Sequence, residues 1–210
     1  MTGTYERFTI FRATRIRLKK LIDALTLRLR CRHRPLRIVV GSGGRSDKGW
    51  ISTNIEQVDI LRGNTWQRYF SENSIDALLA EHVWEHLTEA QGLVAAKNSH
   101  RYLAPGGYLR AAVPDGFHPS NLYIESVKPG GTGPGAGDHK ILYNYRTFKQ
   151  LFLAAGFDVQ LLEWFDENGE FHFTDWDPDA GMIVRSRRFD PRNQDGSLSY
   201  TSIILDAYRR

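Results

Sequence analysis

The sequence predicts an α/β protein built on a mainly parallel β-sheet. From Leu36 onward, short β-branched and apolar runs alternate with stretches of helical periodicity, which is the order typical of βαβ units. A glycine-rich segment, Gly41 to Gly44, directly follows the first of these runs. Glycines at that place are typical of sheets that bind ligands at the carboxyl ends of their strands.

Length and composition favour one globular unit. The 210 residues correspond to about one domain with an appendage, and 41% apolar with 25% charged residues is typical of a folded chain. No apolar run approaches the ~20 residues of a membrane span, and residues 1–20 lack the apolar core of a secretory signal. The single Cys31 excludes an internal disulfide and a multi-cysteine zinc site. We therefore expect a cytoplasmic protein without a metal.

A basic segment precedes the rest of the chain. Residues 1–37 hold eleven Lys and Arg against Glu6 and Asp23, whereas the remainder holds 17 Lys and Arg against 22 Asp and Glu. Apolar residues recur here at helical spacing, at Leu18, Leu21, Ile22, Leu25 and Leu29. We expect residues 1–34 to form a basic amphipathic helical extension and residues 35–210 a single domain. Packing of the stripe on that domain is the favoured interpretation, and peripheral contact with the inner membrane face is the alternative.

The expected elements follow in order along the chain. Strands are expected at 36–40, 50–55, 75–80, 108–113 and 157–164, and helices at 88–102 and 145–155. Pro105-Gly106-Gly107 marks a turn before the fourth strand. Residues 182–187 and 200–208 are two further strand candidates around a turn-rich connection, which indicates an antiparallel addition to the sheet.

A glycine-rich segment spans residues 115–140 and contains six glycines and three prolines. Loops of this length inside a domain are commonly lids or binding loops. Polar and aromatic side chains lie in and beside it, at Asp115, His118, Tyr123, Asp138, His139 and Tyr143. We therefore expect an ordered binding loop here rather than a disordered linker.

Four short motifs occur in sequence. The motif GSGG at 41–44 lets the backbone approach a ligand closely, and without a following Lys-Ser/Thr pair it is not an ATP-binding phosphate loop. In WISTNIE at 50–56, Asn54 ends a strand where a polar side chain commonly holds a ribose diol. The motif EHVWEHL at 81–87 places four titratable groups just after the third strand, and LAPGG at 103–107 leads into the fourth.

Together these motifs resemble the class I S-adenosylmethionine-dependent methyltransferases, in particular a small bacterial branch with Glu-His-Leu and Leu-x-Pro-Gly-Gly motifs. The resemblance implies a Rossmann-like sheet of seven strands, mostly parallel with the last antiparallel, and helices on both faces. It implies S-adenosylmethionine as cofactor and S-adenosylhomocysteine as product. The residues it implies for cofactor binding are Gly41, Ser42, Gly43, Asn54, Ile55, Glu81 and His82. The sequence departs from the family pattern at Ser42, at Asn54, which replaces an acid, and at Asn64-Thr65-Trp66, where an acid near adenine is usual.

Methyl transfer requires an acceptor atom aligned with the donor, and a hydroxyl acceptor also benefits from a base. His139 is the preferred base because histidine titrates near neutral pH, and an orienting role is its alternative. Asp115, His86 and Glu85 are the other candidate catalytic residues. The expected substrate contacts are Asp138, Tyr143 and His118.

The favoured function is O-methylation of a small-molecule or glycan acceptor. Nucleic acid is the less favoured partner because the body of the chain is acidic. A methyltransferase-like binding module without activity is one alternative, since fold alone does not establish activity. A zinc hydrolase is the other, because His82, Glu85 and His86 match the inverted zinc-protease motif His-x-x-Glu-His.

Overall fold

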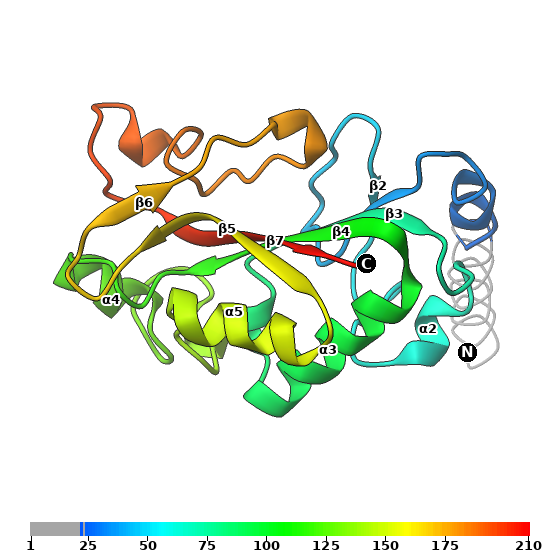
Figure 1. The fold of residues 1–210 in the computed structure, drawn as a ribbon, viewed down its shortest axis with the longest axis horizontal. Helices are drawn as coiled ribbons and strands as arrows, with labels where there is room; N and C mark the ends of the chain where they lie inside the picture. Colours follow the sequence, from blue (N-terminus) through cyan, green and yellow to red (C-terminus); the bar gives the residue numbers. More distant parts are fainter. Residues whose placement is uncertain (1–21, 23) are drawn as a thin grey trace, which may run out of the picture.

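The computed structural model of the chain describes residue 22 and residues 24–210. Its strands are β1 (Arg37–Val39), β2 (Ile51–Ser52), β3 (Ile75–Glu81), β4 (Leu103–Pro114), β5 (Asp158–Phe165), β6 (Phe171–Phe173) and β7 (Ser202–Tyr208). They form one sheet of seven strands in the order β2-β1-β3-β4-β7-β5-β6 (Figure 1). The strands β2, β1, β3 and β4 are parallel, and β7 is antiparallel to both β4 and β5. The predicted mixed sheet with an antiparallel last strand is confirmed.

Two strands differ by more than two residues from their predicted bounds. The second is shorter, because the chain leaves the sheet after Thr53. Thr53 is still tied to β1, since its N–H and hydroxyl both donate to the Val39 carbonyl at 2.8 and 2.9 Å. The fourth begins earlier, because the expected turn at 105–107 lies inside β4 as an irregularity in its pairing with β3. A Cβ at Gly107 would lie 3.0 Å from the Asp76 carbonyl oxygen, so glycine is needed for this close approach of two backbones.

Helices cover one face of the sheet. The helices α2 (Gly63–Trp66), α3 (Glu89–Tyr102) and α5 (Tyr145–Ala154) lie below it in Figure 1, and α4 (Asn121–Val127) lies at one end. Capping boxes at Thr88 and Asn144 fix the starts of α3 and α5. The predicted helices at 88–102 and 145–155 are confirmed. Fully buried aromatic side chains fill the space between helices and sheet, at Trp66, Trp84, Tyr102, Phe148 and Phe152.

Irregular chain covers the opposite face. Residues 174–200, orange in Figure 1, cross this face with single helical turns at Pro178–Ala180 and Pro191–Asn193. Trp176 and Ile183 from this segment pack with Trp50 against the sheet. Helices were expected on both faces, but proline and glycine in this segment do not favour a long helix.

The expected strand at 182–187 is wrong. Val184 and Arg185 donate their backbone N–H groups to the Glu81 carboxylate at 3.0 and 2.8 Å, and Arg187 donates to Glu163 at 2.7 Å. Two carboxylates thus take the hydrogen bonds that a neighbouring strand would take. As a result this segment is held at the carboxyl end of β3.

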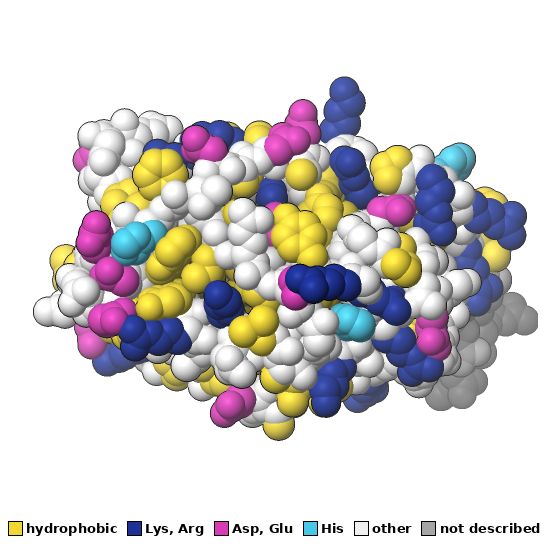
Figure 2. Space-filling view, in the orientation of Figure 1, with side chains coloured by type: hydrophobic (Ala, Val, Ile, Leu, Met, Phe, Trp, Pro, Cys, Tyr) yellow, Lys and Arg dark blue, Asp and Glu magenta, His cyan; other side chains and the backbone are white. Residues whose placement is uncertain are grey.

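The N-terminal extension is helical over residues 24–30. Its Leu27 is buried, but Ile22, Leu25 and Leu29 are 52%, 49% and 59% exposed, so these members of the predicted stripe do not pack on the described part of the domain. Leu18 and Leu21 lie outside the described residues. Lys and Arg side chains gather at this end of the molecule (Figure 2). None of the described helices is both long and apolar enough to cross a membrane.

The glycine-rich segment at 115–140 is ordered around two short helices, α4 and the turn Ala136–Asp138. Ser120 caps α4, and the Gly130 N–H donates to the Ala136 carbonyl at 3.0 Å. The end of the segment is tied to the turn that follows β3, because Lys140 donates its N–H to the Glu85 carbonyl at 2.7 Å. The segment therefore lies along the carboxyl ends of the parallel strands.

Candidate active site

The glycine motif forms a tight loop after β1. Gly41, Gly43 and Gly44 have φ angles of +61°, +58° and +91°, a region that side chains other than glycine rarely adopt. A Cβ at Gly41 would lie 2.8 Å from Cγ2 of Val83. Asn54 fixes the loop, because its Oδ1 accepts from the Gly43 N–H at 3.0 Å and lies 3.1 Å from the Ser42 hydroxyl.

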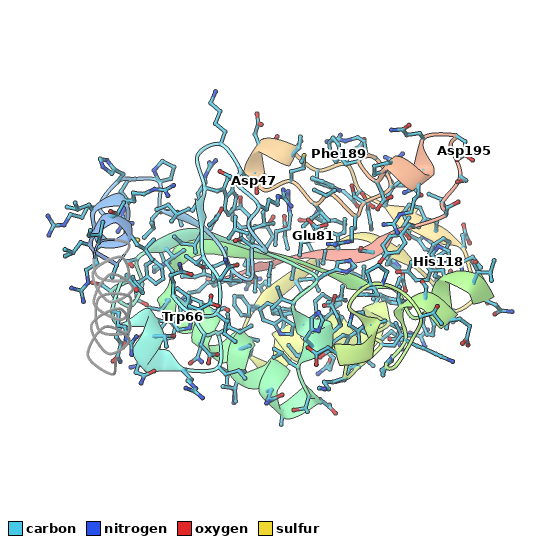
Figure 3. All side chains as sticks on the ribbon, turned by 180° about the vertical axis from the view of Figure 1, so that it is seen from behind. Asp47, Trp66, Glu81, His118, Phe189 and Asp195 are labelled. Atoms are coloured by element: carbon cyan, nitrogen blue, oxygen red, sulfur yellow. The ribbon has the colours of Figure 1, made fainter. Side chains whose placement is uncertain are left out.

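Glu81 ties the loop to the chain that covers the sheet. Arg45 donates to Glu81 Oε2 at 2.6 Å and to the Met182 carbonyl at 2.6 Å. In Figure 3 Glu81 lies between Asp47, which pairs with Arg45 at 2.7 Å, and His118 near α4. Both carboxylate oxygens of Glu81 accept hydrogen bonds within the protein. This residue, which was expected to contact the cofactor, therefore holds the glycine loop against the segment that covers the sheet.

An apolar cavity of about 360 Å³ opens beside the glycine loop. Apolar side chains form most of its wall, at Ile55, Val58, Ile60, Leu61, Val83 and Leu87. Asp59 also lines it, with Oδ1 accepting from the Leu61 N–H at 2.9 Å. The sequence shows no acid at residues 64–66, where one near adenine is usual in the family, and Trp66 of that stretch is fully buried in the core. The signal that could have found Asp59 is an acid between two apolar residues after the second strand.

A second cavity of about 700 Å³ adjoins the first and is more polar. It is lined by the glycine loop, by the turn after β3 and by the glycine-rich segment, including Gly41, Ser42, Gly43, Glu85, His86 and His139. The predicted cofactor residues Gly41, Ser42, Gly43, Glu81 and His82 line this cavity, and Ile55 lines the apolar one. The sequence therefore placed these residues around one region.

A third cavity of about 860 Å³ continues toward α4. It shares His82, His139 and Arg185 with the second cavity. Its walls are rich in rings and hydroxyls, at His118, Ser120, Tyr123, Ser126, Phe165, Ser199 and Tyr200. The size lies within the usual range of small-molecule sites, which is about 300–1,000 Å³.

His82 stands where the three cavities meet, and it lines all of them. Its φ of +55° is unusual for a residue other than glycine, and such backbone strain is concentrated at functional sites. Nε2 lies 3.0 Å from the Ser202 hydroxyl, and Nδ1 lies 3.1 Å from Glu85 Oε1. The zinc-protease alternative needs His82 and His86 on one helical face, but only the single turn Trp84–His86 is helical. The helix that this alternative requires is therefore absent from this segment.

His139 faces the boundary of the second and third cavities. Its Nδ1 lies 2.7 Å from the Val127 carbonyl oxygen, and because a carbonyl only accepts, Nδ1 carries the proton and Nε2 of the neutral ring holds a lone pair. The ring meets that of His86 edge to face, with 4.8 Å between centroids. His139 is 8% exposed, so its orientation is fixed by packing.

Asp115 does not reach these cavities. It is fully buried, and its two oxygens accept from the N–H groups of Phe117 and Phe165 at 2.9 and 2.7 Å. Burial raises the pKa of its carboxyl to about 6, while those two hydrogen bonds lower it. Its contacts join the end of β4 to the end of β5, which is a structural role.

The three residues expected to contact the substrate lie in three different places in the structure. His118 lines the third cavity, stacks on Tyr123 and accepts from the Ser120 N–H at its Nδ1; burial lowers the pKa of its ring. Asp138 is largely exposed and lines the apolar cavity. Tyr143 is buried against α3 and α5, and burial raises its pKa to about 12, so it packs in the core.

Comparison with known proteins finds similarity to methyltransferases. A family model described as a methyltransferase domain matches residues 45–111. A SAM-dependent methyltransferase from Archaeoglobus fulgidus is 14% identical, with 94% of each chain covered and a TM-score of 0.51. One from Mesorhizobium loti is also 14% identical, with 83% of this chain and 91% of that chain covered and a TM-score of 0.47. No curated protein sequence matches this chain.

The sheet order, the antiparallel β7 and the glycine loop define a Rossmann-like α/β fold of the methyltransferase type. The family match and this fold confirm the resemblance to class I S-adenosylmethionine-dependent methyltransferases.

Proposed function

We propose that this protein transfers a methyl group from S-adenosylmethionine to a hydroxyl group of a small molecule or glycan. The observation that carries this proposal is the row of three adjoining cavities along the carboxyl ends of β1, β2 and β3. Ligands of open α/β sheets bind at this edge. Two cavities suit the cofactor, and the third is available for an acceptor.

The residues present fit the cofactor. The apolar cavity of about 360 Å³ suits a purine ring, and Asn54 lies between it and the glycine loop, where a ribose would bind. The methionine part would lie over the loop, because Gly41, Ser42 and Gly43 line the second cavity, which adjoins the apolar one. When bound, the cofactor supplies a methyl group on a positively charged sulfur.

His139 is the residue that we propose accepts the acceptor's proton. Its Nδ1–H donates to the Val127 carbonyl, which leaves the Nε2 lone pair beside the boundary of the second and third cavities. An acceptor hydroxyl in the third cavity would reach this boundary. Proton acceptance by a positioned base contributes about 10²- to 10⁴-fold to such reactions.

The third cavity suits a ring-shaped acceptor. The His118 ring stacks on Tyr123 with 3.9 Å between centroids, and Tyr200 meets Tyr123 edge to face. Aromatic faces pack on the apolar faces of sugars and other rings, and the serine hydroxyls of this cavity offer hydrogen bonds. This chemistry supports a glycan or small-molecule acceptor.

We also propose that the N-terminal helix contacts an anionic membrane surface. The exposure of Ile22, Leu25 and Leu29 supports this, because their stripe is free of the described domain. The basic residues of the same segment complement anionic lipid. Such contact would bring the enzyme to an acceptor held at the membrane.

Calorimetric titration with S-adenosylmethionine and S-adenosylhomocysteine tests the cofactor. We expect saturable one-to-one binding, which Gly41→Ala weakens by about tenfold or more, equivalent to ~1.4 kcal/mol. Gly169→Ala is the matched control, because Gly169 also has a positive φ of +76° but lies in the β5–β6 turn. Absence of binding by folded protein would reject the proposal.

An acceptor screen tests the reaction. Hydroxyl-bearing glycans and small molecules are incubated with S-adenosylmethionine, and formation of S-adenosylhomocysteine is measured. We expect turnover that His139→Gln reduces. Tight cofactor binding without turnover on any acceptor class would favour the binding module.

A further inference from the structure

Three side chains that can bind a metal meet on the wall of the second cavity. Glu85, His86 and His139 each offer one ligand atom, and these atoms lie within 4.8 Å of one another. Glu85 and His86 come from the turn after β3, and His139 from the end of the glycine-rich segment. The backbone bond from Lys140 to the Glu85 carbonyl holds the two segments together at 2.7 Å.

Glu85 is the unusual member of this cluster. It is 1% exposed, and among the described residues neither of its carboxylate oxygens has a hydrogen-bond partner. His82 Nδ1 lies 3.1 Å from Oε1 but does not form a hydrogen bond with it. No Lys or Arg of the described chain forms an ion pair with Glu85. A buried carboxylate is costly unless it is paired or bound to a metal.

Both histidines present free ring nitrogens. His139 Nδ1–H donates to the Val127 carbonyl at 2.7 Å, and such a bond orients most metal-binding histidines and leaves Nε2 to bind the ion. His86 Nδ1 is buried without a hydrogen-bond partner among the described residues, and its nearest acid is Asp138 Oδ2 at 3.4 Å. Neutral imidazole nitrogens and a carboxylate are a common ligand set for divalent transition metals.

We propose that Glu85, His86 and His139 bind one divalent transition metal ion at the boundary between the cofactor and acceptor cavities. Three protein ligands leave coordination positions open. The role of this ion rests on the proposed methyl transfer: an open position binds the acceptor oxygen and lowers the pKa of its hydroxyl. The hydroxyl proton then passes to water, the oxygen forms its bond to the methyl carbon, and the sulfur keeps the electron pair of the broken bond. His139 Nε2 then binds the ion, so in the metal-bound protein this role replaces the base role proposed above for His139.

The test uses the full chain after removal of metals with a chelator and without S-adenosylmethionine. Co²⁺ binding is followed by visible absorption and Zn²⁺ binding by calorimetry. We expect one ion per chain. Glu85→Gln and His139→Gln should each weaken binding by more than about tenfold, a loss that even residues supporting a ligand produce.

Two controls distinguish binding at this site from binding elsewhere on the chain. His172→Gln lies in the other acid-and-histidine cluster of the described chain, Asp166, Glu170 and His172, and should leave binding unchanged. Cooperative thermal unfolding of metal-free Glu85→Gln is the second control, because it shows that a loss of metal binding is not a loss of folding. Absence of binding, or binding that depends on His172 and not on Glu85, would overturn the proposal.

Cofactor titration on the same samples distinguishes the two proposals. Metal binding without S-adenosylmethionine binding would retain this site and reject the methyltransferase. Cofactor binding that is accompanied by no metal binding would reject this site alone.

Discussion

Asn54 Oδ1 lies 3.0 Å from the backbone nitrogen of Gly43 and accepts its N–H. The same oxygen lies 3.1 Å from the Ser42 hydroxyl. An amide at the end of β2 therefore fixes the glycine loop at the end of β1. Asn54 stands where the family pattern has an acid, and its amide oxygen still supplies the hydrogen-bond acceptor that the loop needs.

Two substitutions at Asn54 should distinguish the effect of its hydrogen bonds to the glycine loop from the effect of a negative charge at this position. Asn54→Ala removes both hydrogen bonds, each worth about 1 kcal/mol, so we expect S-adenosylmethionine to bind about 5- to 30-fold more weakly. Asn54→Asp keeps the acceptor oxygen and adds a charge suited to a ribose diol. We expect its affinity to equal or exceed that of the natural protein. Calorimetric titration measures the affinity for S-adenosylmethionine of the natural protein and of both variants. An alanine variant that binds as tightly as the natural protein would contradict the role of Asn54.

The pKa of Asp115 gives stability a specific dependence on pH. Burial raises this pKa from 3.8 to about 6, so the folded state holds the proton more tightly than the unfolded state. The contribution of Asp115 to the free energy of unfolding is therefore fully present below about pH 4. It falls as the pH rises to about 6, by up to about 3 kcal/mol.

Asp115→Asn should remove this dependence, because an amide does not titrate. The amide also places an NH₂ group against a backbone N–H, which lowers stability by an amount independent of pH. We expect urea denaturation between pH 4 and 7 to show that the stability difference between natural and variant protein narrows as pH rises. Other carboxyl groups titrate in both proteins, so their effects on stability cancel when the variant is compared with the natural protein. A difference that stays constant would show that Asp115 is ionised throughout.

Much of the fold follows from local sequence. The starts of α3 and α5 were predictable because Thr88 and Asn144 cap them directly before apolar periodicity. The region of the site was predictable because the ends of parallel strands meet at one edge of a sheet. For the same reason Gly41 and His82 are brought together although they lie far apart in sequence.

Long-range polar contacts account for what was missed. The segment at 182–187 has apolar residues suited to a strand, but Glu81 and Glu163 take its N–H groups, and sequence spacing contains no sign of this pairing. Asp115 lies beside the predicted binding loop, yet its oxygens bond inward to Phe165 and Phe117. The direction in which a polar side chain points depends on tertiary packing, so position in a loop did not decide its role.

Gly92 permits the close contact between α3 and α5. A Cβ at this position would lie 2.9 Å from Leu151 Cδ1 and 3.2 Å from the Tyr143 hydroxyl. Gly92→Ala gains about 1 kcal/mol of helix propensity, but overpacking costs ~1–3 kcal/mol. We expect a net decrease in the free energy of unfolding, measured by urea denaturation. Gly137→Ala is the control, since no atom lies within 4 Å of its Cβ position. A more stable Gly92→Ala protein would show that α5 adjusts without cost.

The exposed stripe of the N-terminal helix predicts binding to anionic vesicles. We expect the full chain to float with vesicles that contain phosphatidylglycerol and to dissociate as salt is raised, because the basic residues are screened. Replacing Ile22, Leu25 and Leu29 together by Ser should abolish flotation and leave the Tm unchanged, since all three side chains are about half exposed.

Val94→Ser is the matched control for this experiment, because Val94 is 45% exposed on α3, away from the N-terminal helix. It should float as the natural protein does. Flotation of the triple variant at the natural level would show that charge alone holds the chain on the vesicle. Absence of flotation by the natural protein would reject membrane contact and leave the stripe available to a protein partner.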